Sequence, residues 1–405
     1  MKKSTLFISF DGLSDPLGQS QILPYLCGIA ANGYQINILS CEKKERFLKE
    51  HIKIQDRIKT LPITWQHIDY KENGGFLLRM VYILKLYILS KKLCQQQSIR
   101  IIHCRSYLAA LIGLSLKIRL NIPFLFDMRG FWADERIDGA IWNKNNFIHK
   151  RFFNFFKRKE KRFLEKSDAV VSLTNAGIQE LASLFPHYHL LEKTTVIPCC
   201  TNTNLFKLNA NSTALKELGL SPIDEVIIYT GSIGTWYYTK EMIDCMLIWK
   251  KFKPNLKFLI LTRDQVELAT ILSKYTEAEK SIVLSKAVSY TEVVNYLSIA
   301  KAALFFIKPS YSKIASSPTK MAECWSLDLP IITNTGIGDN DLFFKQHQGG
   351  ILLSAFNNEA YERAYQDYLA LKQEANHYRQ IALNYFDLDM AIKKYSDIYQ
   401  QLSAD

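Results

Sequence analysis

Short apolar runs alternate along the chain with longer segments in which apolar residues recur every three or four positions. In the first half, the runs predicted as buried strands are residues 4–10, 34–40, 101–104, 123–127 and 169–173. In the second half, they are residues 226–230, 256–261, 281–284, 302–307 and 329–333. Helical spacing lies between most of these runs, as in residues 21–31, where Asn32 and Gly33 provide a stop signal. Strands that alternate with helices in this way indicate parallel sheets covered on both faces.

A polar, turn-rich segment at residues 197–212 separates the two series of strands and is interpreted as a linker. The sequence therefore predicts an α/β protein with two Rossmann-like, doubly wound parallel-sheet domains, at residues 1–200 and 201–387. Ligands of such sheets bind beyond the carboxyl ends of the strands. We expect the two domains to face each other across a cleft, with the site at these strand ends.

The most lipophilic segment, residues 76–93, is interrupted by Arg79 and Lys85. Each of these charges is costly at the centre of a bilayer. Because the aliphatic residues recur at helical spacing, the segment is predicted to form a buried amphipathic helix and not a membrane span. We expect neither a signal peptide nor a transmembrane segment.

The 405 residues include 51 Lys and Arg against 39 Asp and Glu, which gives a net charge of +12. Such an excess favours polyanionic or membrane-surface partners. The chain has no RRM, KH or helix-turn-helix signature, so a nucleic-acid partner is not expected. The eight cysteines include no C-x-x-C pair, which is typical of reduced thiols and indicates a cytoplasmic protein.

The strongest candidate site is the segment SSPTKMAE at residues 316–323. Ser317 is expected to cap a helix and Pro318 to take its first position, so that free N–H groups at the helix N-terminus face a phosphate. Lys320 adds a positive charge in the first turn, where a cation is otherwise unfavourable. Glu323, one turn further on, is suited to accept two hydrogen bonds from a ribose diol. The alternative is an ordinary capped helix with a surface lysine and glutamate.

Two strand-to-helix turns are further candidates. Gly231 and Ser232 directly follow the first strand of the second half, and small residues there let a ligand approach the backbone. The alternative is an ordinary turn. After the first strand of the chain, a helix is expected to begin near Gly18 to Ser20 and to offer a second anion-binding N-terminus, which includes Gln19.

The segment FDMRGFWADER, residues 126–136, also follows the end of a predicted strand. Its five charged groups beside aromatic residues indicate binding, with Asp127 and Arg129 as candidate catalytic residues. A salt-bridged structural loop is the alternative, because ion-pair networks imitate functional sites.

Six segments occur in an order that resembles bacterial family 4 glycosyltransferases, which are group 1 glycosyltransferases of GT-B fold. These segments are DGLSDPLGQSQILPYL, FDMRGFWADERIDG, SDAVVSLTNAGIQEL, VIPCCTNTNLF, IYTGSIGTWY and SPTKMAECWSLDLPIITNTGIGD. The resemblance extends over nearly the whole chain. It implies an N-terminal acceptor-side domain, on which a C-terminal helix at about residues 388–405 packs back, and a C-terminal domain that binds the nucleotide sugar.

The resemblance implies that the protein transfers a sugar from a nucleotide diphosphate sugar with retention of the anomeric configuration. The donor base, UDP or GDP, stays open. No metal and no cofactor are expected, because helix ends and basic side chains carry the diphosphate charge. Glu323 matches the glutamate that binds the donor ribose, Gly18 the loop that faces the diphosphate, and Asp127 a strand end near the reacting sugar. The predicted donor-binding residues are Gly18, Gln19, Gly231, Ser232, Ser317, Thr319 and Glu323, and the predicted catalytic residues are Asp127, Arg129 and Lys320.

The chain departs from the family pattern at three positions. The family has glutamates eight positions apart, and the earlier one falls at Ala315. Ser232 and Tyr237 stand near the places of the usual arginine and lysine. The candidates to supply the missing charge are Lys240, Lys308 and Lys320, of which Lys320 is preferred because of its place at a helix N-terminus. The alternatives to a transferase are a nucleotide-sugar epimerase on the same scaffold and a catalytically impaired sugar-binding homologue.

Residues 149–166 have the sequence HKRFFNFFKRKEKRFLEK. They hold eight Lys and Arg and two Glu, so their charge of +6 is half of the net charge of the chain, +12. Phe152, Phe156 and Phe163 fall near one face of the predicted helix. One interpretation is a helix that lies on an anionic inner-membrane surface. This suits a lipid-linked saccharide acceptor and a peripheral role in cell-surface polysaccharide or lipopolysaccharide biosynthesis. The other interpretation is that the aromatic face packs into the first domain and the charges are solvated.

Overall fold

The computed structural model describes residues 4–71, 75–210, 213–372 and 374–404. The chain divides into two compact units. The N-terminal unit consists of Met1–Cys200 together with Leu388–Asp405, and the C-terminal unit consists of Thr201–Asp387. The expected linker at 197–212 spans the passage from one unit to the other, and positions 211 and 212 lie outside the described residues.

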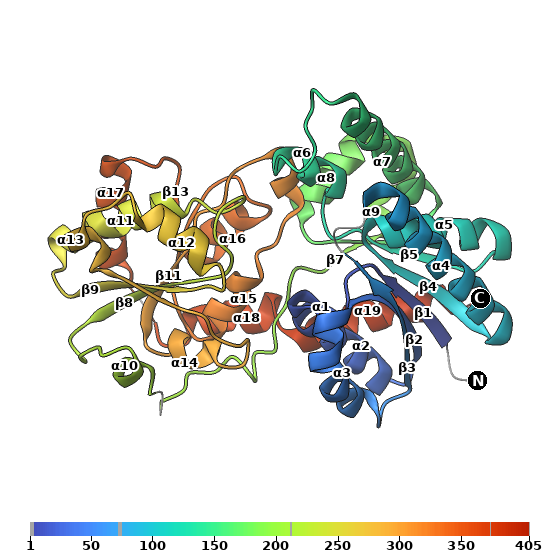
Figure 1. Ribbon diagram of the computed structural model, residues 1–405, viewed down its shortest axis with the longest axis horizontal. Helices are drawn as coiled ribbons and strands as arrows, with labels where there is room; N and C mark the ends of the chain where they lie inside the picture. The colour runs from blue at the N-terminus through green and yellow to red at the C-terminus, as the bar shows by residue number, and fades with distance from the viewer. Residues whose placement is uncertain (1–3, 72–74, 211–212, 373, 405) are drawn as a thin grey trace. The chain divides into compact units, whose positions relative to one another are not determined.

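The N-terminal unit is built on a parallel seven-stranded sheet with the strand order β3-β2-β1-β4-β5-β6-β7 (Figure 1). The strands are β1 Ser4–Ser9, β2 Gln35–Lys43, β3 Ile63–Tyr70, β4 Ile99–Arg105, β5 Phe124–Asp127, β6 Ala169–Ser172 and β7 Thr194–Val196. The apolar pattern predicts the five inner strands. It misses the edge strands β3 and β7, whose side chains are in large part half-exposed and therefore less uniformly apolar.

Helices cover both faces of this sheet (Figure 1). One face carries α2 (Leu23–Ala31), α3 (Lys44–Ile58) and α19 (Leu388–Leu402), and the other carries α4 (Gly75–Gln96), α5 (Ser106–Leu120) and α7 (Phe147–Lys166). The shorter helices are α1 Pro16–Gln21, α6 Trp132–Asp138, α8 Asn175–Leu184, η1 Pro186–Tyr188 and α9 Leu190–Lys193. The helix predicted at 21–31 begins later, at Leu23, because α1 already ends at Gln21.

The helix α4 is buried along one stripe, at Tyr82, Leu86, Ser90 and Leu93, as expected of an amphipathic helix, but its other sides are also apolar. Met80, Val81, Leu84 and Ile88 are each between 44% and 57% exposed. Tyr82 and other residues of the same helix are buried, so apolar side chains point in more than one direction from its axis. Among the described residues, no helix is long and apolar enough to cross a membrane.

The C-terminal unit has a parallel six-stranded sheet with the strand order β10-β9-β8-β11-β12-β13. The strands are β8 Glu225–Thr230, β9 Leu256–Leu261, β10 Val283–Lys286, β11 Ala300–Leu304, β12 Ile331–Asn334 and β13 Gly350–Leu353. The helical segments are α10 Ala214–Glu217, α11 Thr239–Phe252, α12 Gln265–Leu272, α13 Glu277–Lys280, α14 Val293–Leu297, η2 Tyr311–Ala315, α15 Thr319–Ser326, α16 Asn340–His347, α17 Asn358–Ala370 and α18 His377–Tyr385. The edge strand β13 is not predicted by the pattern, and the strand predicted at 281–284 lies two residues later, as the edge strand β10.

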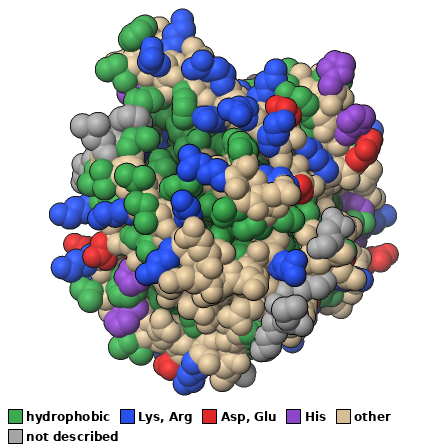
Figure 2. Space-filling view, turned by 90° about the vertical axis from the view of Figure 1, so that its right-hand side faces the viewer, with side chains coloured by type: hydrophobic (Ala, Val, Ile, Leu, Met, Phe, Trp, Pro, Cys, Tyr) green, Lys and Arg blue, Asp and Glu red, His purple; other side chains and the backbone are tan. Residues whose placement is uncertain are grey.

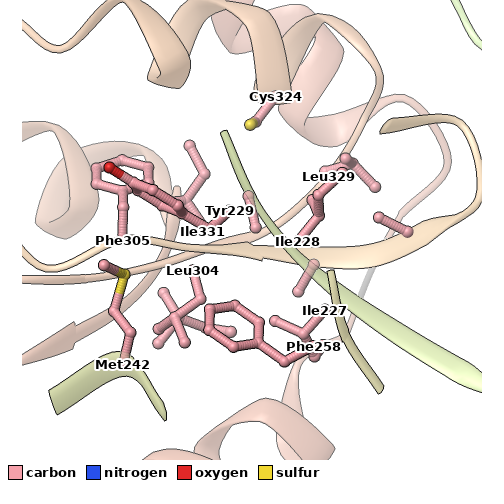
Figure 3. Packing of buried hydrophobic residues seen from close by; sticks show 14 of the residues in the cluster. Ile227, Ile228, Tyr229, Met242, Phe258, Leu304, Phe305, Cys324, Leu329 and Ile331 are labelled. Carbon is pink, nitrogen blue, oxygen red and sulfur yellow. The ribbon is translucent and has the colours of Figure 1, made fainter. Parts of the chain in front are cut away.

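The core of the C-terminal unit lies on both sides of its sheet. Figure 3 shows Met242 of α11 and Phe258 of β9 on one side of the strands and Cys324 of α15 on the other. These three side chains are at most 2% exposed. Burial on both faces explains why the inner strands are nearly continuous apolar runs. The predicted fold class, two Rossmann-like parallel sheets covered by helices, is confirmed.

Candidate functional site

Three loops at the carboxyl ends of β8, β11 and β12 are fixed to one another in the C-terminal unit. The backbone N–H of Lys308, after β11, donates to the carbonyl of Trp236 in the loop after β8 (2.8 Å). The N–H of Gly338, after β12, donates to the carbonyl of Lys313 in η2 (2.8 Å). These three strands are neighbours in the sheet, and ligands of doubly wound sheets bind at this edge.

Gly231, at the end of β8, has a backbone conformation that a larger residue rarely adopts. Its φ is +142°, and a Cβ at this position would lie 3.3 Å from Nζ of Lys320. Glycine therefore lets the ammonium group of Lys320 come close to the backbone. Gly231 and the adjacent Ser232 are exposed, so this turn, predicted to bind the donor, is open to a ligand.

Lys320 is buried and lies among aromatic rings, so it is not the surface lysine of the alternative interpretation. Its side chain is 6% exposed, and Nζ lies 3.9 Å from the ring centroid of Tyr237. The rings of Tyr229 and Phe305 are 5.4 and 5.5 Å away. The negative faces of aromatic rings attract a cation. The ring of Tyr237, in the loop after β8, thus holds the ammonium group of Lys320, which is a residue of α15.

Glu323 lies one helical turn after Lys320 and is half-buried. Burial raises the pKa of its carboxyl group to about 7, and both the charge of Lys320 and a hydrogen bond from Tyr290 work in the opposite direction. The group is therefore poised to change its charge near neutral pH. A ligand hydroxyl that donates to the carboxylate favours the ionised form.

The helix α15 begins at Thr319, and its N-cap residue is Pro318. The expectation that Ser317 caps the helix is therefore wrong, because proline at the cap position shifts the start by one residue and Ser317 precedes it. Ser317 and Thr319 are both half-buried beside the start of the helix. Their predicted role in donor binding stays a prediction.

The earlier acidic position of the family pattern contributes no charge here. Ala315 is the last residue of η2 and is fully buried. Of the other lysines considered as replacements, Lys240 forms an ion pair with Asp244 (2.5 Å) on α11, and Lys308 is exposed. The buried cation of Lys320 is the one that the fold places against Gly231.

In the N-terminal unit, Asp127 lies within a buried network of charged and polar groups. Its Oδ2 lies 3.6 Å from a guanidinium nitrogen of Arg105, which pairs with it in register across β4 and β5. The same oxygen lies 3.6 Å from Nε2 of His103 and accepts a hydrogen bond from Tyr395 of α19 (3.1 Å). Burial works to raise the pKa of Asp127, but Arg129, His103 and Arg105 outweigh it, and the pKa lies below its ordinary value. Asp127 is thus an ionised carboxylate in an ion-pair network.

Three members of this network, His103, Arg105 and Tyr395, are not predicted from the sequence. A signal existed for Arg105, because it ends an apolar strand as Asp127 does. Tyr395 lies 268 positions after Asp127 and carries no such signal.

Arg129 follows β5 in a left-handed conformation, with a φ of +57°. Its guanidinium group lies 3.3 Å from Sγ of Cys199 and 3.5 Å from Oε1 of Gln21. Left-handed backbone at a residue other than glycine is costly and is held in place by its surroundings. The structure therefore brings Asp127 and Arg129 together in the N-terminal unit, and their catalytic role stays a prediction.

The loop after β1 does not have the geometry that the sequence predicts. Its helix, α1, begins at Pro16 and not near Gly18 to Ser20. The backbone N–H groups of Leu13 and Ser14 are already bound by the carboxylate of Glu42, at 2.7 and 3.1 Å. The sequence predicts the phosphate donors at a helix N-terminus near Gly18, whereas these N–H groups earlier in the loop bind an internal carboxylate.

Gly18 and Gln19 both contact this loop. A Cβ on Gly18 would lie 2.0 Å from the carbonyl oxygen of Gly12, so glycine is required for close packing of α1 on the loop. The side-chain amide of Gln19 donates to the carbonyl of Ser14 (3.4 Å). These contacts give both residues a structural role, and donor binding by them stays a prediction.

The basic helix α7 packs its aromatic face into the N-terminal unit. Phe156 and Phe163 are 7% and 0% exposed. Their rings lie 4.7 Å from Trp132 and 5.2 Å from Phe126. The aromatic face of residues 149–166 is therefore not available to a membrane, which corrects the first interpretation of that segment. Among the described residues, no group of three or more His, Cys, Asp or Glu is placed to hold a metal ion.

Residues 26–205 match the sequence model of a family described as Glycosyltransferase Family 4. The match covers 180 of the 405 residues and shows that this part of the chain is similar to that family. The resemblance noted in the sequence is confirmed, and the protein is a glycosyltransferase with two Rossmann-like sheets. A comparison with curated protein sequences finds no match.

Solved glycosyltransferases share the fold over nearly the whole chain. Sucrose-phosphate synthase from Thermosynechococcus elongatus is 16% identical, with a TM-score of 0.71 and 100% of both chains covered. Anabaena HepE in complex with UDP and glucose is 12% identical, with a TM-score of 0.68, 98% of this chain and 100% of that chain covered. WaaG, a glycosyltransferase involved in lipopolysaccharide biosynthesis, is 13% identical, with a TM-score of 0.66, 98% of this chain and 99% of that chain covered. At these identities the likeness shows the GT-B fold of the glycosyltransferase.

Proposed function

We propose that this glycosyltransferase moves a sugar from a nucleotide diphosphate sugar to a saccharide or lipid-linked acceptor in cell-surface polysaccharide biosynthesis, with retention of configuration and without a metal. The observation that carries the proposal is the ammonium group of Lys320, buried against Gly231 and Tyr237 at the strand edge, with Glu323 one turn away. A fixed cation suits a diphosphate, and a carboxylate suits a ribose diol. HepE, which has this fold, was solved with UDP and glucose.

The chemistry that these residues support is electrostatic. When the bond from sugar to diphosphate breaks, negative charge grows on the leaving oxygen, and a preorganised cation stabilises that charge most. Lys320 is such a cation, and Glu323 orients the donor through its ribose. Inversion would need a general base with a pKa near the working pH. Asp127, the first candidate for such a base, is buried and already contacts Arg105, His103 and Tyr395.

The experiment that tests this function is incubation of the protein with a panel of UDP- and GDP-sugars. We expect slow release of UDP or GDP from one donor. NMR of the transfer product should show that the product keeps the anomeric configuration of the donor. Conversion of one nucleotide sugar into its epimer without release of nucleotide would favour the epimerase. Donor binding without any turnover would favour an impaired sugar-binding homologue, which the buried Ala315 keeps open.

Turnover is expected to survive EDTA. The positive charge that the proposal assigns to the leaving diphosphate comes from Lys320 and from helix N-termini. The measurement is nucleotide release before and after treatment with EDTA, followed by addition of magnesium or manganese. Loss of activity that either metal restores would contradict the metal-free mechanism.

The acceptor side is proposed to lie against an anionic cytoplasmic membrane surface, through α4 and α7. Figure 2 shows hydrophobic and basic side chains interspersed on this side of the molecule. The helix α4 exposes the apolar residues described above and contains Arg79 and three lysines but no Asp or Glu. The helix α5 packs against both α4 and α7, which places the two on one face of the sheet. A basic surface with exposed apolar residues suits the interface of anionic lipids.

A groove along α7 adds exposed cations to this surface. It is lined by Phe147, Lys150, Arg151, Arg158, Lys161 and Phe185, among others. Lys157, in contrast, is paired with Asp134 (2.9 Å) and with the buried Glu160 (2.6 Å) and serves the fold. The membrane proposal therefore rests on the other cations of the helix and on exposed residues such as Phe147, which is 76% exposed.

Changing four of these cations to glutamine should weaken binding to anionic vesicles, by about 1 kcal/mol per charge near the surface. The four residues are Lys150, Arg151, Arg158 and Lys161, all exposed. The matched control changes four exposed lysines of the C-terminal unit, Lys216, Lys251, Lys274 and Lys301, and so loses the same net charge. Co-sedimentation with phosphatidylglycerol vesicles measures the effect. Equal loss in both variants would show that net charge alone, and not α7, brings the protein to the membrane.

A further inference from the structure

We propose that the N-terminal unit binds one internal water molecule, held by Nε2 of His103, Nε of Arg105 and Oδ1 of Asp127. The three residues line a cavity of about 10 Å³ within that unit. A cavity of this size has room for a single water molecule and for nothing larger. The site is independent of the proposed donor chemistry, because all of its residues belong to the N-terminal unit.

The three residues are charged or polar and almost wholly buried. His103, Arg105 and Asp127 are 2%, 4% and 1% exposed. Among the described residues, none forms a hydrogen bond with Nε2 of His103, Nε of Arg105 or Oδ1 of Asp127. Buried polar atoms nearly always have a partner, so three such atoms on residues around one cavity indicate a bound molecule.

The other polar side chains at the cavity already have partners. The amide of Gln21 donates to the carbonyl of Cys200 (3.0 Å), and the hydroxyl of Tyr25 donates to the same carbonyl (3.3 Å). Tyr395 donates to Oδ2 of Asp127 (3.1 Å). The unmet hydrogen bonds at the cavity are therefore those of the two basic residues and of the second oxygen of Asp127.

The ion pairs of the network are too long to be hydrogen bonds. Oδ2 of Asp127 lies 3.6 Å both from Nε2 of His103 and from a terminal guanidinium nitrogen of Arg105. Nε of Arg105 lies 3.7 Å from a carboxylate oxygen of Asp11. A direct hydrogen bond from nitrogen to oxygen is about 2.7–3.2 Å long, and water often bridges polar groups that are more than about 3.5 Å apart. The spacing of the network is thus that of groups joined through a water molecule.

The tautomer of His103 supplies one of the donors that a water molecule needs. The hydroxyl of Tyr399 lies 2.8 Å from Nδ1 of His103, and burial keeps this hydroxyl protonated by raising its pKa. Burial also lowers the pKa of His103, so the ring is neutral. Because Tyr399 donates to Nδ1, the ring proton lies on Nε2. Nε2 of His103 and Nε of Arg105 are then two donors, and Oδ1 of Asp127 is an acceptor.

The charges around the cavity favour a neutral molecule. A metal cation would lie against the guanidinium group of Arg105, and an anion would lie against the carboxylate of Asp127. An ammonium ion has no lone pair with which to accept from either donor. Water both accepts and donates, and it typically forms about three hydrogen bonds inside a protein. It also fixes the plane of the Asp127 carboxylate, because it holds the oxygen to which Tyr395 does not donate.

A crystal structure of the full chain at high resolution tests the proposal. We expect one peak of electron density at about 2.7–3.2 Å from each of Nε2 of His103, Nε of Arg105 and Oδ1 of Asp127. A structure without this peak would overturn the proposal. Direct hydrogen bonds from both basic side chains to Asp127 would overturn it as well, because they would leave the water no partners.

NMR of the full chain with nitrogen-labelled histidine tests the same site in solution. We expect a signal from the Nε2–H of His103, and an NOE from this proton to water with the sign of a long-lived complex. His103→Gln assigns the signal by removing it. A ring proton on Nδ1, or an Nε2–H signal without an NOE to water, would contradict the proposal.

Tyr395→Phe is the matched control. It keeps the ring and removes a hydroxyl of the same network, whose exchange with solvent imitates an NOE from water. The NOE should persist in this variant, and its loss would assign it to the hydroxyl and overturn the proposal. Thermal unfolding shows whether each variant is folded, and the crystal structure of the unaltered protein decides if either is not.

Discussion

Replacing Lys320 by methionine should lower donor turnover by roughly 100-fold or more while weakening donor binding by a smaller factor. Charge grows on the leaving diphosphate in the transition state, so a fixed cation stabilises that state more than the bound donor. Methionine keeps the length and the apolar stem of lysine. It therefore avoids the cavity that alanine would leave between Tyr229, Tyr237 and Phe305.

The measurement is kcat for donor hydrolysis together with the donor Kd from calorimetry. Lys320 works to lower the pKa of Glu323, so its removal should also move the pH dependence of donor binding upward. Lys301→Met, on an exposed position of the same sheet, should leave kcat and Kd unchanged. Equal losses in kcat and in binding would argue against transition-state stabilisation by Lys320.

Glu323→Gln should weaken donor binding at pH 8 by about 1.5–3 kcal/mol, because a charge-assisted hydrogen bond to a ribose hydroxyl becomes a neutral one. In the unaltered protein the carboxyl group has a pKa of about 7. It is protonated below that pH and ionised above it. Donor affinity should therefore rise from pH 6 to pH 8 in the unaltered protein and stay flat in Glu323→Gln.

A UDP-sugar or a GDP-sugar is the probe of choice for this series, because its diphosphate has no terminal phosphate that titrates in the same range.

The substitution Glu323→Gln should also stabilise the fold above pH 7, by about 1–3 kcal/mol. The folded protein binds the proton of Glu323 more tightly than the unfolded chain, so stability is lost as the pH rises from 4.5 through 7. A variant that binds the donor less well and unfolds at a higher temperature would show that Glu323 is retained for binding. A pH-independent affinity in the unaltered protein would remove Glu323 from the ribose site.

The inner strands of both sheets could be predicted from the sequence, and the edge strands could not. An inner strand is buried on both faces and shows up as a continuous apolar run, as in β8 and β9. The edge strands β3, β7, β10 and β13 are partly exposed, so their composition is mixed and their position was missed or displaced. The burial of the helix α4 could be predicted only in part, for a related reason. The spacing of its apolar residues does not show which sides of the helix are covered by other parts of the fold.

The site residues divide in the same way, into those that a local sequence pattern predicts and those that only the fold brings together. Lys320, Glu323 and Gly231 stand in short local patterns, and the structure brings Lys320 close to Gly231. Glu42 gave no local signal, because it binds a loop about 28 residues before it.

Because α19 follows the whole C-terminal unit in the chain, the N-terminal unit cannot be completed until the C-terminal unit has been translated. Tyr395 reaches Asp127, and Tyr399 reaches His103, only after the whole C-terminal unit has been translated. At about 5–20 residues per second, this interval lasts roughly ten to forty seconds. During it, the surface of α2 around Gly28, against which Ile392 packs in the finished protein, is open to solvent. Nascent chains stalled before Leu388 are therefore expected to be held by chaperones and cleaved by proteases in this region, and completed chains to resist both.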